Sequence, residues 1–306
     1  MNRMIQQHHV VCLAVALLGA GGIASGQETR RSNPDQLAKG RAEVYKTVGE
    51  TQLKLFVFTP PGHKDSDKRP AVVFFFGGGW TSGSPGQFAP HCERLAARGM
   101  VAIAADYRVF SRQKAQVCDC VSDAKSAIRW VRSNAAKLGV DPGKIAAGGG
   151  SAGGHLAAAV ATLDGFDEKT EDATVSSRPN ALLLFNPALD LTPDGFGRKA
   201  DDKKADNFRE RLGAESKSLS PTHNIKTGGP PTILFHGRSD TTVPFKQAEE
   251  FARLMKEAGN RCDLIGYDGQ PHGFFNFGRN ENKFYDDTLA KADAFLVSLG
   301  WLKPAP

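Results

Sequence analysis

The segment that most constrains the fold is a short apolar run that leads, through glycines and one serine, into a second apolar run. Residues 145–147 read Ile-Ala-Ala, residues 149–153 read Gly-Gly-Ser-Ala-Gly, and residues 155–163 are rich in alanine and leucine. The first run suits a buried strand and the last suits a helix. A Cβ on either outer glycine would collide with the neighbouring strand or helix. This order predicts a sharp strand-to-helix turn with Ser151 at its tip.

Apolar runs and helical periodicities alternate along the rest of the chain. Residues 43–59 alternate in polarity around Gly49 and Glu50, which predicts an antiparallel hairpin. Further strands are expected at 71–76, 100–107, 181–185, 232–235 and 264–267, and helices at about 87–97, 121–138 (stopped by Gly139), 246–258 and 284–299. Buried strands alternating with helices predict a single α/β domain whose mostly parallel sheet is covered by helices on both faces.

The N-terminus has a composition of its own. Arg3 precedes an uncharged apolar run over residues 10–20, followed by small residues up to Gly26. This pattern predicts a secretory signal peptide over 1–26, then a polar leader over 27–41. A membrane anchor is the alternative, but the run is shorter than the roughly 20 residues that a span needs. We therefore expect an exported, secreted or periplasmic protein whose folded domain occupies 42–303.

Charge and cysteine content restrict partners and cofactors. The net charge of +6 is scattered, whereas nucleic-acid binding would require clustered basic residues. Signal cleavage would leave Cys92, Cys118, Cys120 and Cys262, for which three fully paired connectivities exist and unpaired thiols are equally compatible. The Cys-Asp-Cys spacing lacks the two-residue gap of zinc sites. We expect no nucleic-acid partner, no metal and no organic cofactor.

Three polar residues follow predicted strands and could form a proton relay. A serine nucleophile needs an adjacent base. His272 lies in a Gly-Gln-Pro-His-Gly loop after the last strand, and Asp240 follows the strand before it. Because carboxyl ends of parallel strands share one edge, Asp240 could orient His272, which would take the proton of Ser151. Asp268 is the competing acid, but it is close to His272 in sequence. Four other histidines are interpreted as structural: His91, His155, His223 and His236.

A second glycine run supplies candidate hydrogen-bond donors. Residues 77–79 are all glycine and follow a predicted strand, so their backbone can face a substrate oxygen without a side chain in the way. The amides of Gly78 and Gly79, together with that of Ala152, would form an oxyanion hole. A plain turn is the alternative. The glycines at 148–150 do not form a phosphate loop, because the Gly-Lys-Ser/Thr ending is missing.

Four motifs in this order resemble those of the α/β-hydrolase fold. The likeness is strongest to the small-ester carboxylesterases of the hormone-sensitive-lipase-like group and to secreted acetyl-xylan and feruloyl esterases, and it covers roughly 42–300. The motifs are Phe-Gly-Gly-Gly-Trp at 76–80, the glycine-serine turn at 149–153, His-Gly-Arg-Ser-Asp at 236–240 with Val243-Pro244, and His-Gly-Phe at 272–274. The resemblance implies the order Ser, Asp, His of this fold. Phe76 replaces the family's bracing histidine, a change that removes no donor amide.

The sequence therefore predicts a serine carboxylic-ester hydrolase for short acyl esters, with acetyl or feruloyl groups on carbohydrate as candidate substrates. The stretch from Gln27 to Gly77 is mostly hairpin, so the family's helical N-terminal cap should be absent or reduced. Residues 189–228 form a charged insertion over or beside the site, unlike the apolar lid of a lipase. Trp80 could stack on a sugar or pack internally.

Two other functions are compatible with the same motifs. A serine peptidase of this fold would need a propeller or large cap, for which the chain has no room. A non-catalytic binding protein would usually have lost a member of the relay, and none is missing here. We expect no membrane partner after signal cleavage, and the sequence leaves the oligomeric state open.

Overall fold

The computed structural model describes residues 39–196 and 208–304. The predicted signal peptide, most of the polar leader and the centre of the charged insertion lie outside these residues. A single eight-stranded sheet runs through the described part, in the order β1-β2-β4-β3-β5-β6-β7-β8. The strands are β1 (Arg41–Val48), β2 (Thr51–Phe58), β3 (Arg69–Phe75), β4 (Val101–Ala105), β5 (Val140–Gly150), β6 (Ala181–Phe185), β7 (Thr232–Gly237) and β8 (Cys262–Tyr267).

The sheet is parallel except at one edge. β1 and β2 form the predicted antiparallel hairpin, and β2 also runs antiparallel to β4. Every other neighbouring pair is parallel. The predicted fold class, an α/β-hydrolase with a mostly parallel sheet, is confirmed. Its consequence for function is that β3, β5, β6, β7 and β8 end at one edge, where ligands of open α/β sheets bind.

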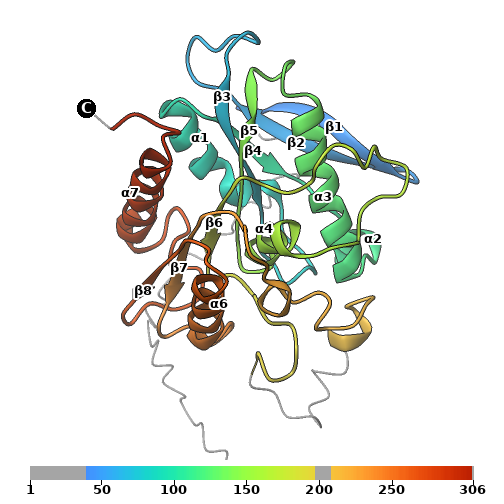
Figure 1. Ribbon diagram of the computed structural model, residues 1–306, viewed down its shortest axis with the longest axis vertical. Coiled ribbons are helices and arrows are strands. Elements are labelled where there is room, and N and C mark those ends of the chain that lie inside the picture. Colours follow the sequence, from blue (N-terminus) through green and yellow to red (C-terminus); the bar gives the residue numbers. More distant parts are fainter. Residues whose placement is uncertain (1–38, 197–207, 305–306) are drawn as a thin grey trace, which may run out of the picture. The chain divides into compact units, whose positions relative to one another are not determined.

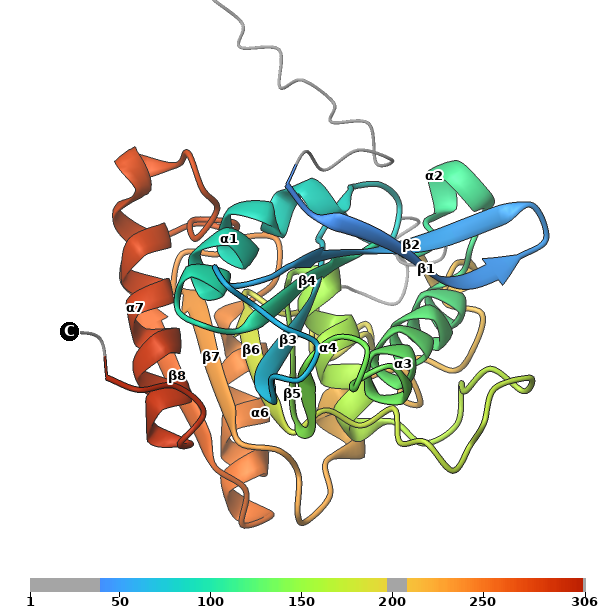
Figure 2. The same cartoon turned by 90° about the horizontal axis from the view of Figure 1, so that it is seen from above.

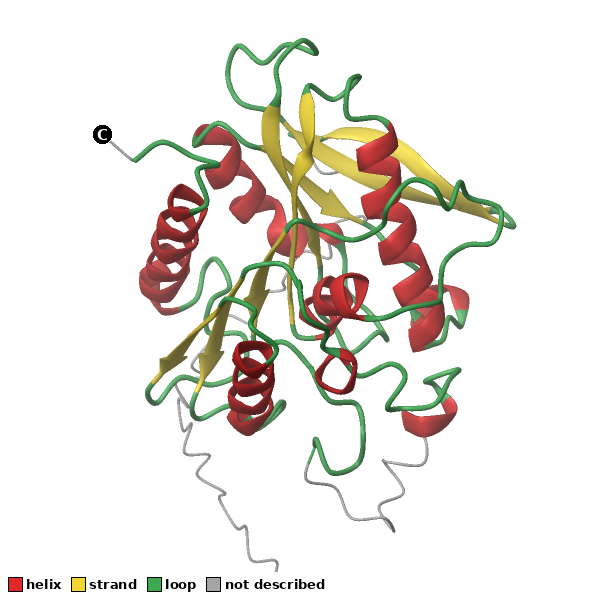
Figure 3. Cartoon of the chain, viewed as in Figure 1, coloured by secondary structure: helices red, strands yellow, loops and turns green. Residues whose placement is uncertain are grey.

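Helices cover both faces of the sheet (Figures 1 and 2). One face carries α1 (Ala89–Ala97) and α7 (Lys283–Ser298), and the other carries α3 (Val117–Ser133), α4 (Ala152–Thr162) and α6 (Phe245–Glu257). Figure 3 shows the strands as the layer between them. The short α2 (Phe110–Gln113) and the 3-10 helices η1 (Pro85–Phe88), η2 (Pro221–Asn224) and η3 (Asn280–Asn282) lie in the connections.

The apolar residues of β3 pack into the hydrophobic cores on both faces of the sheet. Val72 and Phe74 pack toward α1 and α7, whereas Val73 and Phe75 pack toward α3 and α4. All four side chains are at most 1% exposed. Because successive side chains of a strand point to opposite faces, a strand buried on both faces has to be apolar throughout.

The helix predicted over 121–138 ends earlier than expected. α3 stops at Ser133, and its C-cap residue Asn134 donates a side-chain hydrogen bond to the carbonyl of Trp130 at 2.9 Å. The backbone amide of Asn134 donates to the same carbonyl at 3.0 Å, so the side chain adds a second donor at this helix end. Leu138 is still buried, but it lies in the turns that lead to β5. Burial at helical spacing was therefore not sufficient to locate the helix end.

The four cysteines predicted to remain after signal cleavage are unpaired. Cys92, Cys120 and Cys262 are buried, and Cys118 is partly buried. Burial raises the pKa of all four thiols, that of Cys262 to about 12. A bridge between the region of Cys92 and that of Cys118 and Cys120, one of the alternatives left open by the sequence, is not formed.

His91 of α1 is a buried imidazole inside an aromatic cluster. Its ring centre lies 4.7 Å from that of Phe88 and 4.9 Å from that of Tyr285. Neither ring nitrogen has a hydrogen-bond partner among the described residues. Burial lowers the pKa of His91 to about 3. The imidazole is therefore neutral and acts as an aromatic packing group.

This burial predicts a pH-dependent stability. The folded pKa of His91 lies below the value of 6.5 in an unfolded chain, so the unfolded state binds more protons. The contribution of the buried, neutral His91 to the free energy of unfolding is fully present above about pH 6.5. It is lost toward pH 3, at roughly 1.4 kcal/mol per pH unit. We expect the free energy of unfolding of His91→Leu, measured in urea at pH 6.5, 5.5 and 4.5, to fall less with decreasing pH than that of the parent protein. A decline as steep as that of the parent protein would contradict this role of His91.

Candidate active site

Ser151 occupies the sharp turn between β5 and α4. Its φ of +56° and ψ of −119° lie outside the regions that non-glycine residues usually adopt. Hydrogen bonds hold this backbone in place: the amide donates to the carbonyl of Phe185 at 2.9 Å, and the carbonyl accepts from Ala188 at 3.3 Å. Strain of this kind persists only where the surroundings enforce it. The end of β6 thus fixes the serine at the carboxyl edge of the sheet.

The glycines that flank this turn have no space for a side chain, as predicted. A Cβ on Gly149 would lie 2.5 Å from the carbonyl oxygen of Phe75, and a Cβ on Gly153 would overlap that same oxygen. Gly150 is equally confined, because its Cβ would lie 2.5 Å from the ring of Phe275. The helix that follows the serine can approach the sheet this closely only because these positions are glycine.

We expect Gly153→Ala to lower the free energy of unfolding by at least about 3 kcal/mol, because a backbone carbonyl cannot move away as a side chain can. Alanine in a helix is normally favoured over glycine by roughly 1 kcal/mol. A loss of stability in Gly153→Ala would therefore indicate a steric clash. Gly143→Ala is the matched control, since its Cβ would only meet Asp141 Oδ1 at 3.3 Å. Chemical denaturation of both variants measures the difference. Equal stabilities would contradict the close approach.

Asp240 and His272 form a hydrogen-bonded pair at the same edge. Asp240 follows β7, His272 follows β8, and the Nδ1 of His272 lies 2.6 Å from Oδ2 of Asp240. The carboxylate side chain is fully buried, whereas the imidazole is 22% exposed. When Nδ1 carries the proton that is donated to the carboxylate, Nε2 keeps its lone pair. This arrangement leaves Nε2 able to accept a proton.

Further donors surround the carboxylate of Asp240. The amides of Thr242 and Val243 donate to Oδ1 at 2.8 and 2.9 Å. Asn186 Nδ2 donates to Oδ2 at 2.6 Å, and Nε2 of the buried His236 lies 3.3 Å from Oδ2. Both oxygens are therefore held in place on several sides.

These donors determine the charge of the acid. Burial alone would raise the pKa of Asp240, but the hydrogen bonds from His236, His272, Val243 and Asn186 outweigh it and hold that pKa well below its usual range. Asn186 was not among the residues predicted from the sequence. Its position directly after β6, between two strands that carry site residues, was the available signal.

Asp268, the competing acid, lies apart from this pair. Its carboxylate is 93% exposed and bonded to Arg238 at 2.9 Å. Such an exposed ion pair contributes little. The buried position beside His272 is occupied by Asp240.

The glycine loop after β3 lies against the serine turn. A Cβ on Gly77 would be 3.3 Å from Cβ of Ser151. Gly78 and Gly79 have φ of +125° and +61°, values suited to glycine. Within the described part of the chain, neither of their amides donates to a backbone carbonyl. Ala152 is the first residue of α4, so its amide has no acceptor inside the helix.

An aromatic pair braces this loop in place of the family's histidine. The Phe76 ring stacks on Tyr107 with ring centres 4.1 Å apart, and the Tyr107 hydroxyl donates to the Phe76 carbonyl at 2.7 Å. Trp80 is only 5% exposed and donates from its indole to Nδ1 of His155 at 3.2 Å. Trp80 and His155 are therefore packing residues. Stacking of Trp80 on a sugar, one of the two alternatives, is wrong because its ring is buried.

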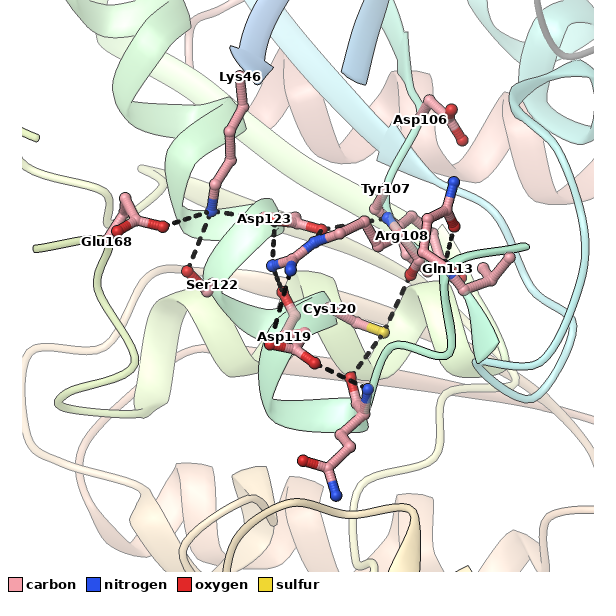
Figure 4. A network of polar contacts seen from close by, with 12 residues as sticks. Lys46, Asp106, Tyr107, Arg108, Gln113, Asp119, Cys120, Ser122, Asp123 and Glu168 are labelled. Carbon is pink, nitrogen blue, oxygen red and sulfur yellow. Dashed lines mark hydrogen bonds and ion pairs between the residues drawn. The ribbon is translucent and has the colours of Figure 1, made fainter. Parts of the chain in front are cut away.

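A buried ionic network holds the segment that carries Tyr107. Figure 4 shows Lys46 and Arg108 converging on Asp123 of α3, at 3.0 and 2.8 Å. Asp123 is fully buried, so its charge has to be compensated, and these two cations lie against it. The network connects β1, the segment after β4 and α3, and it fixes the base of the aromatic brace.

The described part of the charged insertion contacts the glycine loop. Arg211 donates to the carbonyl of Gly79 at 3.0 Å and to the hydroxyl of Thr81 at 2.6 Å. This guanidinium lies beside the candidate oxyanion donors. Among residues 39–196 and 208–304, no group of three or more His, Cys, Asp or Glu side chains is placed to hold a metal ion. In the same residues, no helix has the length and apolar character of a membrane span.

Comparison with known proteins shows the family. Residues 55–255 match the family model described as BD-FAE. The chain is 34% identical over 269 residues to Carboxylesterase NlhH of Mycobacterium tuberculosis, covering 81% of this chain and 79% of that protein. It is 31% identical over 248 residues to the probable isoprenylcysteine alpha-carbonyl methylesterase ICMEL1 of Oryza sativa subsp. japonica, covering 76% of this chain and 56% of that protein. The chain thus spans little more than half the length of this plant relative.

Solved structures give the same assignment. The apo form of Thermogutta terrifontis esterase 2 superposes with a TM-score of 0.84 at 53% identity, covering 89% of this chain and 99% of that one. Other structures of that esterase are described as propionate bound, butyrate bound and phosphorylated by paraoxon. The resemblance inferred from the motifs is confirmed: the chain belongs to the BD-FAE family, among the carboxylesterases of the hormone-sensitive-lipase type on the α/β-hydrolase fold.

Proposed function

We propose that this protein hydrolyses short acyl esters through a triad of Ser151, His272 and Asp240. The observation that carries the proposal is the 2.6 Å bond between His272 and the buried Asp240, at the sheet edge where the strained Ser151 turn lies. An imidazole oriented by an ionised carboxylate is the base that a serine nucleophile requires.

In the proposed reaction, Oγ of Ser151 attacks the ester carbonyl carbon while Nε2 of His272 takes its proton. The oxyanion of the tetrahedral intermediate accepts hydrogen bonds from the amides of Gly78, Gly79 and Ala152. Collapse of the intermediate breaks the bond to the alcohol oxygen, which receives the proton from the imidazolium. Water then attacks the acyl-serine by the same sequence and releases the acid. Asp240 remains ionised and stabilises the imidazolium.

The substrate class is part of the proposal. Structures of the Thermogutta esterase are described as bound to propionate and butyrate, acids of three and four carbons, which supports short acyl groups here. Arg211 beside the glycine loop gives the rim of the site a polar character, which favours small or carbohydrate-borne esters over lipids. Acetyl groups on polysaccharide are the candidate that we favour, with the larger feruloyl group as the alternative. A signal peptide over 1–26 would export the enzyme to such substrates.

A series of p-nitrophenyl esters tests the reaction and its acyl range. We expect turnover of acetate and butyrate, with kcat/KM for palmitate at least about 100-fold lower, because the polar rim at Arg211 does not stabilise a long apolar chain. Paraoxon should abolish activity and add one diethylphosphoryl group, located on Ser151 by peptide mass spectrometry. Cleavage of a peptide anilide with no ester turnover would contradict the proposal and favour a peptidase.

A further inference from the structure

The side-chain amide of Gln87 lies between two loops of the candidate site. Gln87 belongs to η1, which follows the glycine loop in the chain. Its Oε1 accepts a hydrogen bond from the Gly77 amide at 2.6 Å, and its Nε2 donates to Oδ1 of Asn276 at 2.9 Å. Asn276 is separated from Gln87 by 189 positions and lies in the loop that carries His272. One side chain thus contacts both loops.

The bridge continues to the residue after the catalytic histidine. Nδ2 of Asn276 donates to the Gly273 carbonyl at 2.9 Å, and the Asn276 amide donates to the same oxygen at 3.2 Å. Gly273 has a φ of +73°, so this turn is tight. The order of donors and acceptors also fixes how both side-chain amides are oriented. The Gly77 N–H requires the oxygen of Gln87, and the Gly273 carbonyl requires the nitrogen of Asn276.

An apolar contact beneath the bridge joins the same two segments. Phe88 and Phe275, the chain neighbours of Gln87 and Asn276, stack with ring centres 6.1 Å apart. Both rings face Gly150, whose Cβ would lie 2.5 Å from Phe275 and 3.4 Å from Phe88. The two segments therefore meet directly beside the residue that precedes Ser151.

The sheet does not set the distance between these loops by itself. The glycine loop follows β3 and the histidine loop follows β8, and β5, β6 and β7 lie between them. Sheet twist accumulates over such a separation. The oxyanion donors and the base must nevertheless act on one tetrahedral carbon, and a misplacement of about 1 Å can cost 100-fold in rate.

We propose that Gln87 is a positioning residue that couples the oxyanion loop to the His272 loop, with Asn276 as its partner. The bridge holds the amides of Gly78 and Gly79 in register with the imidazole. Gln87 itself contacts no reacting atom. This inference rests on the proposed function, since it assigns a role only if Ser151 and His272 act on an ester.

Gln87→Met tests the role, because it keeps the length of the side chain and removes both hydrogen bonds. We expect kcat for p-nitrophenyl butyrate to fall about 10- to 100-fold, less than the full loss of a donor, with KM changed less than about threefold. Inhibition by a butyl trifluoromethyl ketone, which forms the oxyanion adduct on the serine, should weaken by the same factor. Asn276→Leu should lower kcat by a similar factor. The double variant should have a kcat no lower than that of either single variant, because the two substitutions break the same bridge.

Gln113→Met is the matched control, since Gln113 also accepts from a backbone amide, that of Val109 at 3.0 Å, and should keep kcat within about twofold. If Gln87→Met does not fold, Gln87→Glu retains the acceptor for Gly77 and loses the donor to Asn276, so its kcat should still fall.

Unchanged kcat and inhibition in Gln87→Met or Gln87→Glu, even with a lowered melting temperature, would overturn the inference, provided that Ser151→Ala is inactive. Full activity of Ser151→Ala would instead overturn the proposed function, and the inference with it.

Discussion

Ser151→Ala should lose ester hydrolysis almost completely, with kcat for p-nitrophenyl butyrate reduced by about 10⁴- to 10⁶-fold. The variant removes the only atom that the proposed mechanism joins covalently to the acyl group. The backbone of the turn is held by Phe185 and Ala188, so the fold should persist without the hydroxyl. Steady-state assays at a high enzyme concentration, with circular dichroism as the folding control, measure the effect.

Ser133→Ala is a suitable companion, because Ser133 is an exposed residue at the end of α3 and should change kcat by less than about twofold. Paraoxon should label the Ser133 variant and leave the Ser151 variant unlabelled. Retained turnover in Ser151→Ala would refute the nucleophile assignment.

Asp240→Asn should reduce kcat by about 10⁴-fold, the loss typical of a neutralised triad acid. The amide can donate to Nδ1 of His272, which leaves the proton on Nε2, the atom that has to accept one. The variant should also be less stable. Asn186, His236 and the amides of Thr242 and Val243 all donate to this carboxylate, and an amide has only one oxygen for them.

Asp268→Asn provides the comparison, since the same chemical change is made on a carboxylate that is 93% exposed. Its kcat should stay within about twofold of the parent. The pH profile should separate the two roles as well. Because the pKa of Asp240 is held well below its usual range, this carboxylate should stay ionised, and kcat should not fall through its protonation, on mild acidification. If Asp268→Asn were the damaging change, the acid would have been assigned to the wrong loop.

Local sequence patterns located most of the fold. The apolar run at 181–185 coincides with β6, and the hairpin predicted around Gly49 and Glu50 is β1 and β2. Helix ends were less predictable: α3 stops at Ser133, although burial at helical spacing continues to Leu138. The positions of Asp240 and His272 after neighbouring parallel strands predict that they lie close together, and their side chains are 2.6 Å apart.

Residues close together in the chain determine three features of this protein. These are the order of the elements, the strand-end positions of the candidate triad and the need for glycine around Ser151. Their physical basis is local: side-chain periodicity, backbone torsion and the volume of a Cβ. The hydrogen-bond partners of buried polar groups cannot be located from neighbouring residues. Asn186 donates to Asp240 across 54 positions, and Gln87 meets Asn276 across 189. A hydrogen bond requires two atoms within about 3 Å, a condition that only the packed chain can satisfy. The residue types of the candidate site could therefore be predicted from the chain, whereas the alignment of their side chains is decided by tertiary packing.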